Sequence, residues 1–367
     1  MSKKILLIDN ASLTPVKSTL CCEPKTGEFA KELKDLGNEV TMYGQIVESE
    51  NIHAFNIQEN GINVVGHRRL RVKLFNYISL YLLVIPQIFK SDFIYIFYPS
   101  AFKYIAVLCW IFRKKYGLYI RGQNNLTSRS SNFIYRKSNV IFTVTEYFTQ
   151  YVKSITLKEN VFSIKPMINL DDRDIISDRN HFKKEKLKVL FLARIEKDKG
   201  IEEFLYAILE LIEKYQYKFE VDIVGEGGFL KKAIDISSKI GISESINFKG
   251  AVFDTQKIKD FYLKADIYIL PTYHEGFPRT LYEAMIYGTP IITTFVGGIP
   301  YLMKDKFNCL KIEPKSVESI VDALVYSINN YEKMLDCAKN AQTTVKPIIR
   351  SSRLSHAEAL HHSLCKV

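Results

Sequence analysis

Short runs rich in apolar residues alternate with stretches of helical periodicity through the first half of the chain. The spacing of Phe29, Leu33 and Leu36, followed by Gly37 as a C-cap, predicts a helix over 27–36. Further helices are expected over 75–89 and 101–115, and strands over 5–8, 40–43, 62–65, 93–97, 118–120 and 140–144. Such alternation is typical of a parallel sheet with helices on both of its faces.

A polar, charge-dense segment over 169–188 interrupts this pattern, and a second alternation follows it. Strands are expected there over 189–192, 219–224, 246–248, 267–270 and 291–294, and helices over 201–215, 229–239, 255–264, 279–287 and from 317 onward. We therefore expect an α/β chain of two Rossmann-like domains with parallel sheets that face an interdomain cleft. The predicted divisions are an N-terminal domain over 1–170, a linker over 171–186, a C-terminal domain over 187–345, and a C-terminal helix over 346–367 that packs back towards the N-terminal domain.

The composition excludes several classes of protein. With 367 residues, of which 47% are hydrophobic and 25% charged, the chain is long enough for two domains and too apolar for global disorder. The longest apolar stretch, 75–89, is shorter than a membrane-spanning helix requires, and no secretion signal is expected at the start. The six cysteines show no metal-binding spacing, which predicts reduced thiols and a cytoplasmic location.

Positive charge is concentrated in one segment. The chain has a net charge of +11, whereas residues 60–140 contain thirteen lysines and arginines and a single acid, Asp92. Because this segment is also rich in aromatic and aliphatic residues, three interpretations remain open: a solvated rim, attraction to anionic lipid, or binding to nucleic acid. No helix-turn-helix, zinc-finger or RNP-like pattern accompanies the charge, which argues against recognition of bases.

The segment 271–290 contains the first chemical motif. A strand is expected to end at Pro271, a loop then carries Glu275 and Gly276, and Pro278 fits the first position of a helix that contains Glu283. The N–H groups of that first helical turn form an anion site suited to phosphate. Carboxylates accept hydrogen bonds from the vicinal hydroxyls of a sugar or a ribose. The alternative is that Glu275 only caps the helix and Glu283 lies on its surface.

Three further loops follow predicted strands of the same domain. Arg194 and Lys199, with Gly200 and a helix N-terminus behind them, suit a diphosphate because arginine offers a planar fork and lysine a point charge. Gly225–Gly228, which includes Glu226, and Val296–Pro300 are glycine-containing loops that allow close approach of backbone to a ligand. Each loop alone is compatible with a simple turn, but four at strand ends of one sheet indicate a binding site.

These motifs resemble those of glycosyltransferase family 4, a retaining group with the GT-B fold of two Rossmann-like domains. Glu275 with Glu283 is similar to the family's Glu-x7-Glu motif, and Arg194 with Lys199-Gly200 to its R-x4-K-G motif. The resemblance implies that Arg194 and Lys199 hold the donor diphosphate, that Glu275 binds hydroxyls of the donor sugar, and that Glu283 binds the ribose. It assigns catalytic roles to Glu275, Arg194 and Lys199, and it extends the donor site to Gly276, Phe277, Pro278, Arg279, Thr280, Gly225 and Glu226.

The N-terminal half departs from the family pattern. Only Gly27 remains of the usual glycine loop after the first strand, and no histidine stands where many members have one, so no catalytic histidine is assigned. Arg121, Gly122 and Gln123 are the candidates for contact with the acceptor, together with Tyr98 after another predicted strand. The alternative is that 121–125 is an ordinary loop.

The function expected from the resemblance is transfer of a sugar from a nucleotide diphosphate sugar, with retention, to a glycan or polyprenyl-linked acceptor in bacterial surface polysaccharide synthesis. The enzyme would act without metal or other cofactor, as a peripheral protein on an anionic inner membrane surface and with no nucleic-acid partner. Asp172 and Asp174 resemble a D-x-D metal site but fall in the predicted linker, which argues against that role. The alternatives are a GT-B-fold epimerase or hydrolase of nucleotide sugars, and a basic nucleic-acid-binding protein.

Overall fold

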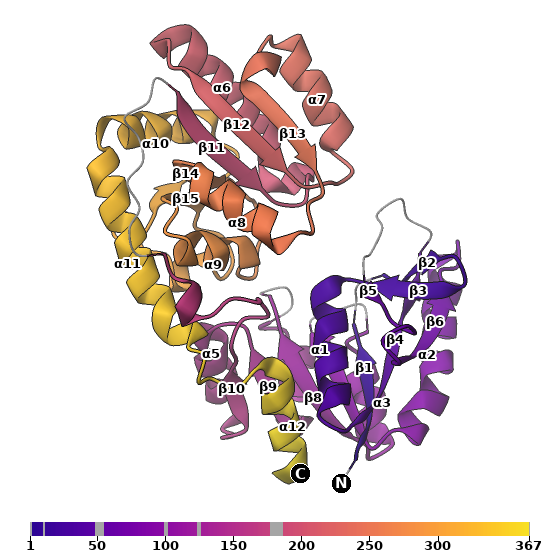
Figure 1. Ribbon diagram of the computed structural model, residues 1–367. Coiled ribbons are helices and arrows are strands. Elements are labelled where there is room, and N and C mark those ends of the chain that lie inside the picture. The colour runs from indigo at the N-terminus through magenta and orange to yellow at the C-terminus, as the bar shows by residue number, and fades with distance from the viewer. Residues whose placement is uncertain are drawn as a thin grey trace. The chain divides into compact units, whose positions relative to one another are not determined.

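The computed structural model describes residues 2–9, 12–47, 55–98, 102–122, 126–176 and 186–366 (Figure 1). The chain divides into two compact units. Unit 1 comprises Met1–Ile168 and Arg353–Val367, and unit 2 comprises Asn169–Ser352. The segment predicted as a linker thus belongs to unit 2, where it contains the 3-10 turn η1 (Asp172–Asp174), and 177–185 lie outside the described residues.

The main sheet of unit 1 has seven parallel strands in the order β10-β9-β8-β7-β1-β4-β6. Every residue of its central strand β7 is buried, as expected for a parallel strand covered on both faces. The strands are β1 (Lys4–Ile8), β4 (Glu39–Ile46), β6 (Asn63–Arg68), β7 (Phe93–Tyr98), β8 (Lys115–Ile120), β9 (Val140–Thr143) and β10 (Val161–Ser163).

Helices cover both faces of this sheet. On one face, α1 (Pro24–Asp35) packs with α12 (His356–Lys366), which belongs to unit 1 although it ends the chain. The other face is covered by α2 (Lys73–Lys90), α3 (Ile105–Ile111), α4 (Arg129–Lys137) and α5 (Glu146–Thr156). The helix predicted over 101–115 is shorter than expected because Lys115 already pairs in β8.

Several elements of unit 1 were not predicted. They are α4, α5, β10 and a small antiparallel sheet in the order β2-β3-β5, formed by β2 (Thr14–Val16), β3 (Thr19–Cys22) and β5 (Phe55–Asn56). These strands have two to four residues, which is too short for an alternating pattern to be recognised.

Unit 2 has a six-stranded parallel sheet in the order β13-β12-β11-β14-β15-β16. The strands are β11 (Leu187–Leu192), β12 (Phe219–Val224), β13 (Ile246–Gly250), β14 (Ile267–Leu270), β15 (Ile291–Thr294) and β16 (Leu310–Ile312), the last of which was not predicted. Its helices are α6 (Ile201–Tyr215), α7 (Leu230–Lys239), α8 (Thr255–Lys264), α9 (Arg279–Ile286), α10 (Val317–Asn329) and α11 (Tyr331–Ile349). The order of connection reverses between β11 and β14, which makes this point the topological switch of the sheet.

The predicted α/β class with two parallel-sheet domains is confirmed. All six cysteines are free thiols, and five of them are buried. Among the described helices, none is both long enough and apolar enough to span a membrane.

Candidate active site

The four loops singled out in the sequence follow four adjacent strands of the unit 2 sheet, β12, β11, β14 and β15. Because these strands are parallel, their carboxyl ends and the loops behind them meet at one edge. The two most charged loops, after β11 and β14, lie next to each other at the switch point. The topology therefore brings the predicted motif residues of unit 2 to a single edge of the sheet.

Lys199 and Glu275 form a partly buried ion pair across this switch point. Nζ of Lys199 donates to Oε1 of Glu275 and, at 3.4 Å, to the carbonyl oxygen of His274. Only 6% of Lys199 is exposed, so its charge depends on these partners rather than on water. The carbonyl of Asp198 accepts hydrogen bonds from the N–H of Tyr273 (2.7 Å) and the hydroxyl of Thr272 (3.2 Å). The lysine predicted to hold a diphosphate thus also orients the carboxylate predicted to bind a sugar.

Arg194 differs from Lys199 because its side chain is exposed and has no hydrogen bond or ion pair within the described part of the chain. Its loop is nevertheless held in place. The N–H of Ile195 donates to the carbonyl of Glu226 (2.9 Å), and the carbonyl of Ile195 accepts from the N–H of Phe229 (2.9 Å). Gly225 has a φ of +137°, and a Cβ there would lie 1.9 Å from the carbonyl oxygen of Ala193. Glycine at 225 therefore permits the loops after β11 and β12 to touch.

Backbone contacts fix the loop that carries Glu275. A Cβ on Gly297, whose φ is +60°, would lie 1.6 Å from the carbonyl oxygen of Glu275. The next residue, Gly298, donates its N–H to the carbonyl of Gly276 at 2.7 Å. The ring of Phe277 is buried against Tyr282, with centroids 4.5 Å apart. The loop after β15 therefore supports the candidate sugar-binding loop, and the close approach at Gly297 requires glycine.

Helix α9 begins at Arg279, the start of the predicted range 279–287, so Pro278 lies just before the helix. Pro278 is its N-cap, with φ −69° and ψ 136°, and Arg279 is the first helical residue. The prediction of Pro278 at the first helical position is wrong because an extended ψ is incompatible with a helical turn. Arg279 is exposed and Thr280 half-buried. The start of the helix still lies directly after the Glu275 loop.

Two buried tyrosines hold the first turn of α9 and Glu283. The hydroxyl of Tyr262 donates to Oε2 of Glu283 (2.9 Å) and to the carbonyl of Thr280 (3.1 Å). The hydroxyl of Tyr268 lies 2.7 Å from Oγ1 of Thr280 and donates to the carbonyl of Leu192 at 3.2 Å. Burial, and then the charge of Glu283, raises the pKa of Tyr262 far above its usual value, so the phenol stays a donor.

Neither tyrosine was singled out in the sequence. A signal existed, because both occur in segments predicted to pack against the core, where a buried phenol requires a hydrogen-bond partner. Their partners, Glu283 and Thr280, were assigned to the donor site, so the tyrosines act as supports of that site.

The residues of unit 1 that were predicted to contact the acceptor lie in different environments. Arg121 follows β8, and its guanidinium donates to Oδ1 of Asp9 at 2.8 Å and lies 4.7 Å from the ring of Phe97. Asp9 follows β1, is 4% exposed and also accepts from the hydroxyl of Thr26 at 2.7 Å. Arg121 is thus part of a charged cluster at the carboxyl edge of the unit 1 sheet, and Asp9 is a member that sequence reasoning missed. Gly122 lies beside it, and Gln123 lies outside the described residues.

The prediction that Tyr98 contacts an acceptor is wrong. Its side chain is fully buried in the core formed by β7 and α4, and its hydroxyl is hydrogen-bonded to the hydroxyl of Ser131 at 2.5 Å. Both faces of a central parallel strand are buried, so a tyrosine at its end packs inwards as readily as outwards.

Asp172 and Asp174 act as local structural acceptors. Oδ1 of Asp172 accepts from the N–H of Ser351 at 2.7 Å, and Oδ2 of Asp174 accepts from the N–H of Asp171 at 2.8 Å. Within the described ranges, no group of three or more His, Cys, Asp or Glu side chains could hold a metal ion.

Comparison with known sequences identifies the region that carries the site. Residues 172–344 match the family model "Glycosyl transferases group 1". An uncharacterized glycosyltransferase of Methanocaldococcus jannaschii, MJ1607, is 30% identical over 40% of this chain and 39% of its own length. The putative teichuronic acid biosynthesis glycosyltransferase TuaC of Bacillus subtilis is 26% identical over 53% of this chain and 46% of its own length. The match therefore spans less than half the length of both relatives.

Solved structures resemble the chain over its whole length. The crystal structure of Anabaena HepE in complex with UDP covers 100% of both chains with a TM-score of 0.69 at 14% sequence identity. At that identity the likeness concerns the fold alone. The chain therefore has the GT-B fold, and its residues 172–344 carry the sequence pattern of the glycosyl transferases group 1 family.

Proposed function

We propose that this protein is a glycosyltransferase that transfers a sugar, with retention, from a nucleotide diphosphate sugar to a glycan or lipid-linked acceptor. The observation that carries the proposal is the partly buried Lys199–Glu275 ion pair at the switch point of the unit 2 sheet. A cation and a carboxylate held together there offer one group to a diphosphate and one to sugar hydroxyls. Similarity of residues 172–344 to glycosyl transferases group 1 supports the same reaction class.

The donor would be held by three groups. Arg194, exposed on the loop after β11, is available for a bidentate contact with phosphate oxygens, and Lys199 supplies a second positive charge. Glu275 would accept hydrogen bonds from the sugar, and Glu283, positioned by Tyr262, from the ribose. As the glycosidic bond breaks, negative charge grows on the leaving diphosphate, and these cations would stabilise it.

Retention is proposed to follow attack from the face of the departing diphosphate, whose oxygen takes the proton of the acceptor hydroxyl. The bond from the anomeric carbon to phosphate oxygen breaks as the bond to acceptor oxygen forms. No metal is assigned a role in this step. The anomeric configuration of the product, determined by NMR, tests retention, and activity in excess chelator tests the metal assignment.

The biological role proposed is surface polysaccharide assembly at the inner face of a bacterial membrane. TuaC, whose name refers to teichuronic acid biosynthesis, supports a polysaccharide product. The acceptor is assigned to unit 1, where Arg121 and Asp9 form a charged cluster at the carboxyl edge of the sheet. The crystallised complex of HepE with UDP favours a uridine nucleotide as the first donor to test.

A calorimetric screen of UDP-, GDP-, ADP- and CMP-sugars tests the donor site. We expect one nucleotide class to bind, and Lys199→Ala and Glu283→Ala to weaken its binding at least about tenfold. Lys214→Ala is a matched control, because Lys214 pairs with Glu210 at 2.8 Å on the exposed side of α6. Unchanged affinity in both site variants would remove the donor assignment. Release of free sugar at the same rate with and without acceptor would instead identify a hydrolase.

A further inference from the structure

Helix α2 presents an apolar surface to solvent. Its buried positions recur at every fourth residue, at Asn76, Leu80, Val84 and Ile88, which leaves only a narrow stripe against the sheet. Much of the rest of the helix is also apolar, where a surface helix normally carries polar residues. Seven of these side chains are between 45% and 66% exposed: Leu74, Phe75, Tyr77, Ile78, Leu82, Leu83 and Phe89.

The apolar surface continues onto α3. The ring of Phe89, near the end of α2, lies 4.9 Å from the ring of Phe112, which directly follows α3. On α3 itself, Trp110 and Ile111 are 46% and 57% exposed. We call these exposed side chains of α2 and α3 the α2–α3 face. Single exposed apolar side chains are common on protein surfaces, but an exposed apolar area that extends over two helices marks a binding surface.

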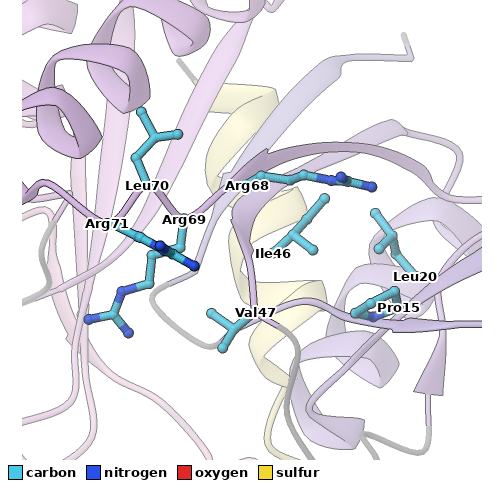
Figure 2. Close-up of a pocket in the computed structure, with 8 residues that line it drawn as sticks. All are labelled: Pro15, Leu20, Ile46, Val47, Arg68, Arg69, Leu70 and Arg71. Atoms are coloured by element: carbon cyan, nitrogen blue, oxygen red, sulfur yellow. The ribbon is translucent and has the colours of Figure 1, made fainter.

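Positive charge borders both ends of the α2–α3 face. A cavity of about 510 Å³ lies before the start of α2, at the carboxyl ends of β4 and β6, and its lining includes Arg68, Arg69 and Arg71. Among the residues that the structure describes, no acid lines it. In Figure 2, Arg68 extends along Ile46 towards Leu20, while Arg69 and Arg71 lie together on the other side. Within the described ranges, none of the three arginines forms an ion pair.

A second cavity lies at the opposite end of the face. It has a volume of about 550 Å³ and combines Trp110 and Ile111 with Arg113, Lys114 and Lys115. Nζ of Lys114 donates to the carbonyls of Phe89 (2.9 Å) and Ser91 (3.0 Å), which ties it to the end of α2. Cations next to exposed aliphatic and aromatic side chains therefore occur at both ends of the same surface.

We propose that the α2–α3 face docks on the surface of an anionic lipid bilayer. The apolar side chains would enter the boundary between headgroups and acyl chains, and the cations at both ends, chiefly Arg68, Arg69 and Arg71, would bind lipid phosphates. Interfacial helices combine leucine, phenylalanine and tryptophan with arginine and lysine in this way. The inference deepens the membrane location given under the proposed function by naming its surface and its ligand.

Charge argues for lipid over a second copy of this chain. In a symmetric dimer the same patch meets itself, so the cations of one copy would approach those of the other. Asp92 is the single acid among residues 60–140, so this segment has too little negative charge to offset the repulsion between the cations. An anionic bilayer supplies the opposite charge and an apolar layer together.

Co-sedimentation with vesicles tests the proposal on the full chain. We expect at least tenfold tighter binding to equimolar phosphatidylglycerol and phosphatidylcholine than to phosphatidylcholine alone at low salt. Trp110 is the single tryptophan, so a blue shift of its emission with anionic vesicles reports entry of this face into the lipid. Equal binding to both vesicle types, or no change in emission on binding, would overturn the proposal.

Two variants separate the contributions. Leu82→Ser with Leu83→Ser should abolish the blue shift, and Arg68→Gln with Arg69→Gln and Arg71→Gln should weaken vesicle binding at least tenfold. The matched control for the leucines is Phe253→Ser, at a position 61% exposed in unit 2. The matched control for the arginines is Lys231→Gln with Lys232→Gln and Lys239→Gln, on α7. Both controls should bind vesicles as the original chain does. Equal losses in variants and controls would contradict a specific face.

Three further measurements identify the occupant. Inorganic phosphate at the phosphate concentration of the vesicles should not displace the protein from them; displacement would indicate a site for free phosphate. Sedimentation velocity should show the same oligomeric state for the original chain and the leucine variant; dissociation of a dimer in the variant would assign the face to a second copy. Nucleotide binding should be unchanged in both variants, so failure of docking and failure of the donor site are distinguishable.

Discussion

The hydroxyl of Tyr262 donates a hydrogen bond to Oε2 of Glu283 at 2.9 Å, from a side chain that is fully buried. Tyr262 lies on α8 and Glu283 on α9, so the bond fixes a carboxylate of one helix to the core of its neighbour. The same hydroxyl contacts the carbonyl of Thr280. Tyr262, which is assigned no contact with a ligand, thus positions Glu283, which is assigned to the ribose.

Tyr262→Phe should weaken nucleotide binding without removing a group assigned to the ligand. Loss of a hydrogen bond to a carboxylate should lower the free energy of unfolding by about 1.5–3 kcal/mol. Because the bond also positions Glu283, the affinity for the nucleotide should fall about threefold to tenfold. Calorimetry and denaturant unfolding measure the two effects separately.

Tyr331→Phe is the control for this change. Its hydroxyl donates to the carbonyl of Asp266 at 3.1 Å, at the amino end of β14 and away from the candidate site. Both variants should lose stability, but only the change at Tyr262 should affect nucleotide affinity. Equal affinity in the two would show that Tyr262 supports the fold alone.

Gly297→Ala should disrupt the Glu275 loop. The added Cβ would lie 1.6 Å from the carbonyl oxygen of Glu275, so either the loop after β14 or the loop after β15 must move. Gly241→Ala is the matched control, because Gly241 has a φ of +76° and no atom within 4 Å of the added Cβ. Both changes introduce backbone strain of about 1 kcal/mol, but only Gly297→Ala should reduce nucleotide binding. Similar affinities for both variants would contradict a supporting role for Gly297.

Arg194 and Lys199 should respond differently to replacement, although one motif contains both. Arg194→Ala removes an exposed side chain, so the free energy of unfolding should change by no more than about 0.5 kcal/mol, while nucleotide affinity falls. Lys199→Met leaves Glu275 without its partner in a mostly buried position, which should cost about 3 kcal/mol.

The double variant Lys199→Met with Glu275→Gln completes the comparison. Removing both charges should recover most of the lost stability, because no uncompensated charge remains buried. Nucleotide affinity should stay low, since both contacts assigned to the donor are gone. If recovery of stability also restored affinity, the ion pair would be structural and the donor assignment would be wrong.

The difference between Arg194 and Lys199 illustrates what the sequence could and could not predict. Strand periodicity and the loops behind the strands were sufficient to place both residues at the carboxyl edge of one sheet. The partner of Lys199 lies 76 residues away, and only the strand order, with β11 beside β14, brings the two together. Which residues pair across a switch point depends on the strand order, and the spacing of residues along the sequence does not specify that order.

The errors in unit 1 have local causes. Helix α4 contains Ser130, Ser131 and Asn132, residues that favour turns and caps, and its N-cap Ser128 was not recognised. Tyr98 was expected to contact the acceptor because it follows a predicted strand, yet its hydroxyl is hydrogen-bonded to Ser131 on that same helix. The helix that was missed is therefore the one that contacts Tyr98.

The stability of unit 1 should fall as the pH drops below about 6.5, the usual pKa of histidine. His356, the first residue of α12, is 4% exposed and lies among the rings of Phe29, Tyr95 and Tyr119. Burial, and then the charge of Arg121, holds the pKa of His356 well below its ordinary value. Below about pH 6.5 the unfolded chain therefore binds a proton that the folded chain does not, and unfolding is favoured. Above that pH this histidine contributes no pH dependence.

His356→Gln should reduce this pH dependence, because the amide is uncharged and retains a hydrogen-bonding group for the hydroxyl of Tyr95, which lies 2.6 Å from Nε2 of His356. Denaturant unfolding at pH 7.5, 6.5 and 5.5 should give a slope smaller by up to about 1.4 kcal/mol per pH unit in the variant. Some dependence should remain, because burial also lowers the pKa of His67. His362→Gln, at an exposed position of α12, is the control and should leave the slope unchanged. An equal slope in His356→Gln and the original chain would show that α12 does not couple unit 1 to pH through this side chain.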